Sequence, residues 1–246
     1  MSEKGTAKIH NDRLFPSNFW DRPKVKARLI GDVSEAPLYL AVGAALTTWE
    51  ITEEIFAHLF SIFSQAGGPV TDMSSMLAVT RVFGAIENTN GRLAAFEAVA
   101  EVYFGEYWHF PEVKKPVQRL INEIKFASWR RNDIAHGKVI RLQVHGEEGE
   151  NSVRHLGCLL VAPTYMTGRT SLFADFSEED KFAFTKSLYR FNSNDILSYK
   201  NKFEALRLKM IDYIQTIYKD PQTRIPKIVL DLQLNVPKAF SRKIPP

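Results

Sequence analysis

The chain contains 246 residues, of which 45% are hydrophobic and 24% are charged, as in an ordinary globular protein. Its only cysteine is Cys158, which excludes an intramolecular disulfide, and no Cys/His cluster has the spacing of a zinc site. The N-terminus lacks the apolar segment of a signal peptide, and the longest nearly apolar run, residues 38–46, is too short to span a bilayer. We therefore expect a cytoplasmic protein that has no membrane association and needs neither a metal nor a cofactor.

The two ends of the chain lack helical periodicity. We predict that residues 1–36 form an irregular N-terminal arm that packs through Phe15, Phe19 and Trp20. Residues 219–246 contain six cations and two acids, which matches the net charge of +4 of the whole chain. We predict a basic, proline-containing tail there. Such a tail suits contact with an anionic polymer, although solvated lysines are its commoner explanation.

Three helical segments precede the middle of the chain. From Pro37, apolar residues recur at alternating steps of four and three, which predicts a long helix that ends at residues 67–69, a Gly-Gly-Pro sequence. The same spacing returns between about Asp72 and Tyr107. Residues 88–91 interrupt it, either as a break between two helices or as a polar kink in one. A further helix is predicted from about Val113 onward.

A segment with a different pattern follows. Residues 139–144 and 156–161 are rich in Val, Ile and Leu and flank a glycine-containing acidic turn, which predicts a β-hairpin. The remainder of the insertion, up to about residue 192, is predicted to continue the hairpin or to cover it irregularly.

The last helix is predicted to have Ser193 or Asn194 as its cap and Asp195 in its first turn. Helices of this length are most simply buried as a bundle. We therefore predict a mainly α protein, a four- or five-helix bundle over residues 37–218, with a small β-hairpin insertion at about 138–192 before the last helix.

The strongest chemical signal is the octet at residues 130–137, Arg-Arg-Asn-Asp-Ile-Ala-His-Gly. Cleavage of RNA without a metal requires proton transfer at the 2′-hydroxyl and the leaving oxygen, and stabilisation of a doubly charged phosphorane. Imidazole suits the proton transfers because its pKa lies near neutrality. Guanidinium grips phosphate oxygens and stays charged throughout. Arg131 and His136 therefore have the chemistry that a metal-free phosphodiester site needs.

The spacing of these two residues limits how they can meet. Five residues on an ideal helix correspond to a rotation of about 140°, so Arg131 and His136 cannot converge on one atom if the helix continues regularly. Either the helix ends near Gly137, a good C-terminal capping residue, or a second copy of the chain completes the site. The chemistry favours the second copy, because a two-fold dimer would supply two arginines and two histidines.

The octet resembles the signature of HEPN domains, in which an arginine and a polar residue precede a histidine by a few variable positions. The matching residues are Arg131, Asn132 and His136, and the neighbouring Arg130 and Gly137 also resemble those of many bacterial members. The resemblance covers residues 37–137 and 193–218. It implies a dimeric helical bundle and, in many members, a metal-independent endoribonuclease with a toxin or defence role.

By that resemblance Arg131 and His136 are catalytic, and Asn132 orients them or touches phosphate. We count Arg130 and Asp133 as supporting residues. The implied partners are RNA, a second copy of the chain and, in a toxin, a cognate antitoxin, whose existence the sequence leaves open. The alternative is a non-catalytic module that binds RNA or protein. In that case Arg131 and Asp133 belong to a structural ion-pair network, and His136 only caps the helix.

Overall fold

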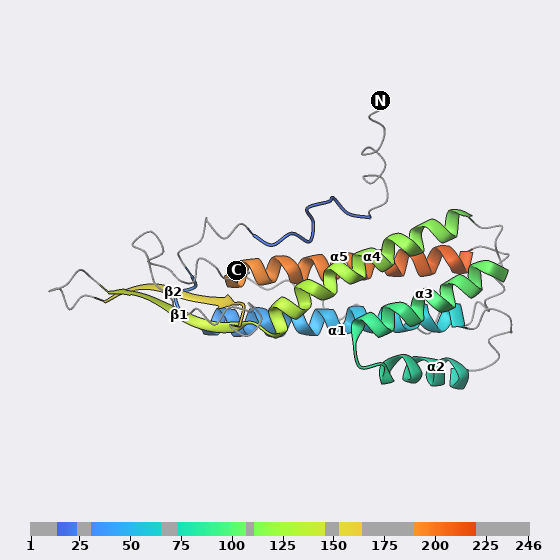
Figure 1. Cartoon of the computed structure of the whole chain (residues 1–246), viewed down its shortest axis with the longest axis horizontal. Helices are drawn as coiled ribbons and strands as arrows, with labels where there is room; N and C mark the ends of the chain where they lie inside the picture. The colour runs from blue at the N-terminus through green and yellow to red at the C-terminus, as the bar shows by residue number, and fades with distance from the viewer. Residues whose placement is uncertain are drawn as a thin grey trace, which may run out of the picture. The chain divides into compact units, whose positions relative to one another are not determined.

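The computed structural model describes residues 14–23, 31–64, 73–106, 111–145, 153–163 and 189–219. Within these ranges the protein is mainly helical and has one small sheet (Figure 1), which confirms the predicted fold class. None of the described helices is long and apolar enough to cross a bilayer. In chain order the elements are α1 (Ala36–Ser64), α2 (Met73–Ala85), α3 (Thr89–Glu106), α4 (Pro111–Ala135), β1 (Lys138–His145), β2 (Val153–Val161), β3 (Arg190–Phe191) and α5 (Ser193–Lys219).

The chain forms two compact units. The first comprises Met1–Glu54 and Gln118–Leu208, and the second comprises Ile55–Val117 and Lys209–Pro246. The octet and the sheet both belong to the first unit. The predicted tail after residue 219, the Gly-Gly-Pro stop at 67–69 and the acidic turn of the hairpin lie outside the described residues.

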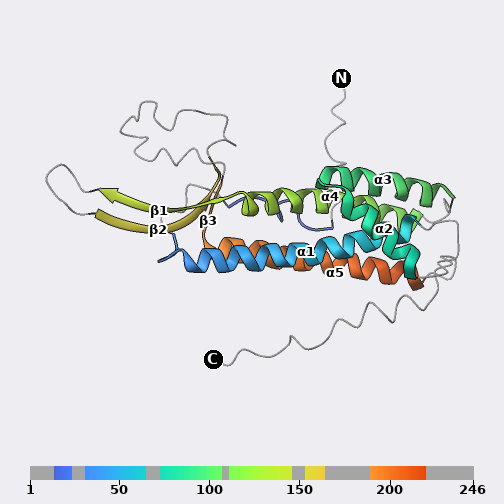
Figure 2. The same cartoon turned by 90° about the horizontal axis from the view of Figure 1, so that it is seen from below.

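The core of the first unit forms where α1 and α5 run alongside each other (Figure 2). The rings of Trp49 and Phe203 lie 5.3 Å apart, centroid to centroid. The hydroxyl of Thr52 donates to the carbonyl of Thr48 at 2.8 Å and also lies 3.4 Å from the carbonyl of Phe203. Trp49, Thr52 and Phe203 belong to the helical stripes that sequence periodicity assigned to the interior, and all three are buried.

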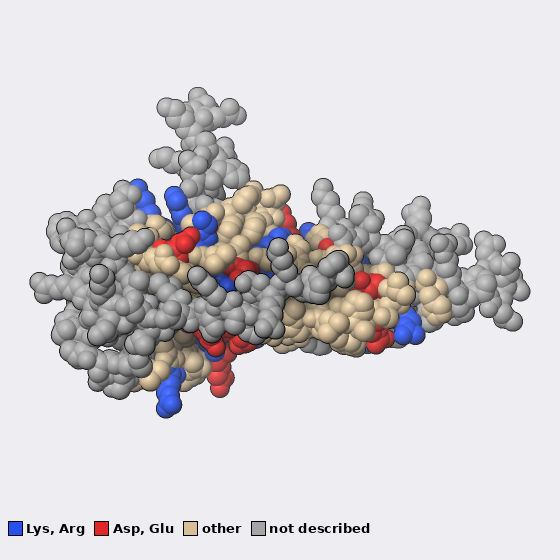
Figure 3. All heavy atoms as spheres, turned by 180° about the vertical axis from the view of Figure 1, so that it is seen from behind, with Lys and Arg blue, Asp and Glu red and all other residues tan. Residues whose placement is uncertain are grey.

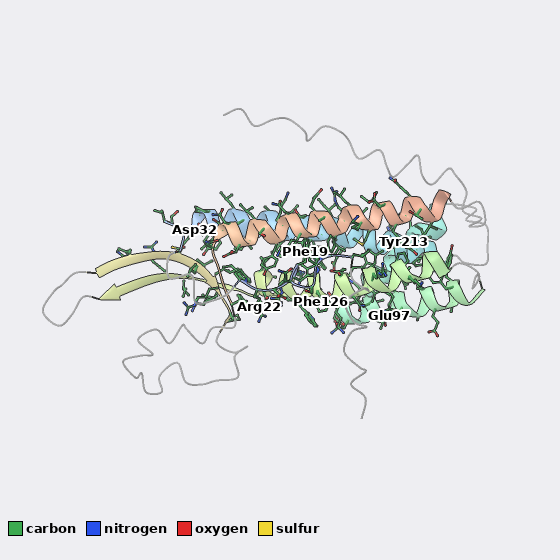
Figure 4. The ribbon with its side chains drawn as sticks, turned by 90° about the horizontal axis from the view of Figure 1, so that it is seen from above. Phe19, Arg22, Asp32, Glu97, Phe126 and Tyr213 are labelled. Atoms are coloured by element: carbon green, nitrogen blue, oxygen red, sulfur yellow. The ribbon has the colours of Figure 1, made fainter. Side chains whose placement is uncertain are left out.

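The N-terminal segment at residues 14–23 adds a layer to this core. Trp20 is 5% exposed and stacks on Phe203 with ring centroids 6.0 Å apart. Its indole N–H donates to the carboxylate of Glu123 on α4 at 2.5 Å. The phenol of Tyr199 on α5 donates to the carbonyl of Asp21 at 2.7 Å, and burial raises its pKa to about 12. The segment therefore joins α4 to α5 (Figure 4).

The sheet is antiparallel, with the strand order β1-β2-β3. Its first two strands form the predicted hairpin. β3, which pairs Phe191 with Leu160, lies at the end of the segment that was predicted either to continue the hairpin or to cover it irregularly. Asp32 forms an isolated antiparallel bridge with Cys158, on the edge of β2 that faces away from β1. Gly157 adopts a φ of 99°, and a Cβ atom there would lie 2.7 Å from backbone atoms of Gly31 and Asp32. This close backbone approach requires glycine.

The core of the second unit is aromatic. The Phe56 ring lies 5.1 Å from that of Phe83 on α2 and 4.9 Å from that of Phe96 on α3. The interruption at 88–91 is a true break between these helices, because α2 ends at Ala85 and α3 begins at Thr89. The side chain of Asn88 accepts a hydrogen bond from the N–H of Gly91 at 2.7 Å and so caps α3.

The cap of α5 is Asn192, which precedes both predicted caps, Ser193 and Asn194. The side chain of Asn192 accepts from the N–H of Asp195 at 2.9 Å, and Asp195 accepts from the N–H of Asn192 at 3.1 Å. This reciprocal pair is a capping box. The hydroxyl of Ser193 donates to Asp32 at 2.6 Å.

Gly137 connects α4 to β1 and leaves room for a side chain of β2. A Cβ atom at this position would lie 2.6 Å from Cγ of Leu160, which is 2% exposed. We expect Gly137→Ala to lower the free energy of unfolding by about 1–3 kcal/mol, since Leu160 has no space to move into. The measurement is denaturant unfolding followed by circular dichroism.

Gly43, in the middle of α1, provides the matched control, because a Cβ atom there meets nothing within 4 Å. Gly43→Ala should stabilise the protein by about 0.5–1 kcal/mol through helix propensity alone. Equal effects of the two substitutions would contradict the packing role of Gly137.

Candidate functional site

The octet occupies the last turns of α4 and the first residues after it. The N–H of His136 donates to the carbonyl of Asn132 at 3.0 Å, so the helical turn continues through His136, one residue beyond Ala135. The octet is not uniformly exposed. Arg130 and Asp133 are buried, Arg131 and Asn132 are half-buried, and His136 is exposed.

Asp133 is the centre of an ion-pair cluster. Its carboxylate accepts two hydrogen bonds from Arg22, at 2.9 Å from Nε and 2.7 Å from Nη2. Nη1 of Arg130 lies 3.0 Å from the same carboxylate. The hydrogen bonds with Asp133 raise the pKa of the Arg22 guanidinium. The side chain of Asp133 therefore holds the helix end in place and faces away from solvent.

Tyr189, the residue that precedes β3, also contacts this cluster. Its phenol donates to the carbonyl of Asp133 at 2.7 Å. The guanidinium of Arg22 lies over the Tyr189 ring, 5.2 Å from its centre. The sequence did not indicate a role for Arg22 or Tyr189, because they stand 111 and 56 residues away from Asp133. Neither residue belongs to a local pattern that could have revealed it.

Arg131 faces α1. Its Nη2 lies 3.7 Å from a carboxylate oxygen of Glu50, and its Nη1 donates to the side chain of Asn132 at 3.2 Å. Glu50 keeps 62% of its side-chain surface exposed, so this ion pair is weak. Nε of Arg131 is buried and has no hydrogen-bond partner. The Arg131 side chain as a whole stays 31% exposed.

The structure does not bring Arg131 and His136 of one chain together. Because the helical turn continues through His136, the two side chains stay about 140° apart around the axis. Gly137 does not adopt the left-handed φ of a typical helix C-cap; among the described glycines only Gly157 has a positive φ. The end of the helix therefore does not fold the imidazole back toward the guanidinium.

Sequence analysis also gave no role to Trp129, the residue before the octet. Its indole is 44% exposed, and Phe126 and Lys125 lie beside it. The sequence made no prediction for Trp129, and only the packed structure identifies it as exposed.

In the part of the chain that the structure describes, no three His, Cys, Asp or Glu side chains are grouped so that they could hold a metal ion. No protein-family model, no curated protein and no solved structure matches the chain. The chemical assignment of the octet therefore depends on its own residues and their geometry.

The Asp133 cluster predicts a large cost for removing its charge. We expect Asp133→Asn to lower the free energy of unfolding by about 2–4 kcal/mol, since it leaves the buried Arg130 without its ion-pair partner. The value is below that of a fully buried pair because Arg22 is 32% exposed. Chemical denaturation at neutral pH measures the change.

The ion pair between Arg141 and Glu35 is the matched control, since the two side chains are 56% and 42% exposed and lie 3.7 Å apart. Glu35→Gln should change the stability by less than about 1 kcal/mol. If Asp133→Asn cost no more than Glu35→Gln, the cluster would have no structural role.

Proposed function

We propose that this protein is a metal-independent endoribonuclease that cleaves single-stranded RNA through a site shared by two copies of the chain. What supports the proposal is the separation of the two reactive groups on α4. Arg131 keeps a guanidinium half-exposed on one side of the helix, and His136 presents an exposed imidazole on another. One chain supplies each group once, in different directions, so two apposed helices would be needed to surround a phosphate.

In this proposal the imidazole of His136 takes the proton of the ribose 2′-hydroxyl or donates a proton to the 5′-oxygen that leaves. The 2′-oxygen forms a bond to phosphorus as the bond to the 5′-oxygen breaks, which leaves a 2′,3′-cyclic phosphate. Arg131 binds the non-bridging oxygens, whose charge grows in the transition state. Asn132, which already contacts Arg131, positions that guanidinium. Arg130 and Asp133 keep the helix end rigid.

The resemblance of the octet to HEPN domains points to the same reaction and adds a biological setting. An enzyme of this kind would act on host or invading RNA as a toxin or in defence, and a toxin would require a cognate antitoxin. These roles are proposals that follow from the resemblance alone.

A second candidate function is a non-catalytic module that binds RNA or protein. The observation in its favour is the involvement of the octet in structure: Asp133 is bonded to Arg22 and Arg130, and Arg131 contacts Glu50 and Asn132. Such a module would bind without producing a cyclic phosphate.

The direct test is incubation of single-stranded RNA with the protein in EDTA, with product ends identified by mass spectrometry. We expect a 2′,3′-cyclic phosphate and a rate that falls by about 10²- to 10⁴-fold in His136→Ala, because proton transfer is lost. His136 is exposed, so this variant should keep its stability within about 0.5 kcal/mol.

His155 on β2 is also exposed and supplies the control for an accessible histidine. His155→Ala should cleave at the wild-type rate. Equal cleavage rates for His136→Ala and wild type would show that His136 does not transfer a proton in the reaction. Binding of RNA with no cyclic product would favour the non-catalytic module.

A shared site makes activity depend on assembly. We expect the rate per chain to fall when the protein is diluted below its dimer dissociation constant, because a single chain lacks one half of the site. Sedimentation velocity over the same concentrations measures the dimer fraction. A rate per chain that stays constant while the dimer dissociates would exclude a shared site.

A further inference from the structure

Trp129 is an exposed aromatic side chain that the proposed reaction does not use. A single exposed apolar residue is ordinary on a protein surface, so its neighbours decide its significance. The Phe126 ring lies nearly perpendicular to the indole, with centroids 5.2 Å apart, and packs beside it. Nζ of Lys125 lies 5.9 Å from the centre of the Trp129 ring. A cation and a supported aromatic face therefore occur together.

Trp129 belongs to a stripe of α4 that ends at His136. Residues at alternating steps of four and three share one face of a helix. The stripe consists of Gln118, Asn122, Lys125, Trp129, Asn132 and His136. The hydrogen bond from His136 to Asn132 continues this face to the end of the helix. His136 lies seven positions after Trp129, which corresponds to about 10.5 Å along the helix axis. This distance is short enough for one strand to contact both residues.

This stripe carries no acidic residue. Between Gln118 and His136 the only acids are Glu123 and Asp133, which are 1% and 7% exposed and are bonded to Trp20 and to two arginines. Elsewhere charge is mixed: Figure 3 shows a face of the protein on which Asp and Glu lie among Lys and Arg. Along this stripe a polyanion would meet Lys125 and polar amides and no exposed carboxylate of α4 itself. The exposed carboxylate of Glu50 on α1 lies beside Arg131, where it pairs with the guanidinium.

We propose that Trp129 is a stacking platform for a base of single-stranded RNA, and that Lys125 binds a phosphate of the same strand. The α4 stripe would hold a nucleotide beside the phosphate that His136 acts on. Every base has a π face, so the platform accepts any sequence, but it rejects duplexes, whose bases are already stacked. The inference rests on the proposed function only for the position of the scissile phosphate.

The test measures binding separately from cleavage. The probe is a fluorescein-labelled single strand of 2′-O-methyl RNA, which lacks the attacking hydroxyl, and fluorescence anisotropy gives its dissociation constant. Loss of one base stack should weaken the binding to Trp129→Ala by about 5- to 100-fold. Trp129→Phe should retain most of the affinity, because it restores an aromatic face. A strand of the same length with abasic residues should bind wild type and Trp129→Ala equally.

Tyr39 on α1 is 58% exposed, and Tyr39→Ala is the control for removal of an exposed aromatic residue. Tyr39→Ala should bind the labelled RNA strand with the affinity of the wild type. Lys125→Gln should reduce the slope of log affinity against log salt concentration by about 0.7, the value for one phosphate contact on a single strand. Lys209→Gln, at an exposed lysine of α5, should leave the slope unchanged.

Wild-type affinity of Trp129→Ala for the intact strand would overturn the platform, as would an equal loss on intact and abasic strands. If Trp129→Ala changes the sedimentation coefficient of the protein but causes no base-dependent loss of RNA affinity, Trp129 contributes to a contact between two copies of the chain. Cleavage of unmodified RNA separates the two proposals. If binding depends on the bases but no cyclic phosphate forms, the stacking role of Trp129 is supported and the nuclease proposal is wrong. If cleavage depends on His136 but Trp129→Ala binds like wild type, the nuclease proposal is supported and the stacking role is wrong.

Discussion

The carboxylate of Asp133, shared by the guanidinium groups of Arg22 and Arg130, fixes the end of α4. Tyr189 reinforces it through the carbonyl of the same residue. These contacts connect the N-terminal segment, the long helix and the approach to β3. Two positive groups on one buried carboxylate are stable only if all three segments are in place, because each charge left alone would be poorly solvated. The position of the neighbouring octet residues follows from this cluster.

In this arrangement the side chains of the octet point in different directions. Arg130 and Asp133 point inward and stabilise the fold, whereas Arg131 faces Glu50 and His136 faces solvent. The helical hydrogen bond that continues to His136 keeps the two outward groups apart. A rigid helix end therefore presents two reactive groups that only another molecule can combine. The same rigidity would serve a catalytic site, since it limits the motion of both groups before a phosphate binds.

Folding also sets the charge of the outer face of α4. Glu123 and Asp133 are withdrawn from solvent by Trp20 and by arginines, and the cation Lys125 stays outside beside Trp129. The total charge of the chain is modest, so composition alone would not indicate a surface that suits RNA. The burial of two carboxylates leaves the face of α4 around Lys125 without an exposed acid of that helix, and the proposed contact with RNA relies on this face.

The sequence by itself determined the helices, the hairpin and the octet, because a helix shows its buried face through residues only three or four apart. It left open whether 88–91 is a break, and it misplaced the cap of α5, since side-chain hydrogen bonds of Asn88 and Asn192 decided both. Only the tertiary structure identified the partners of Asp133 and the exposure of Trp129. The reason is physical: contacts between residues far apart in the chain, and the surface that remains after packing, have no local period.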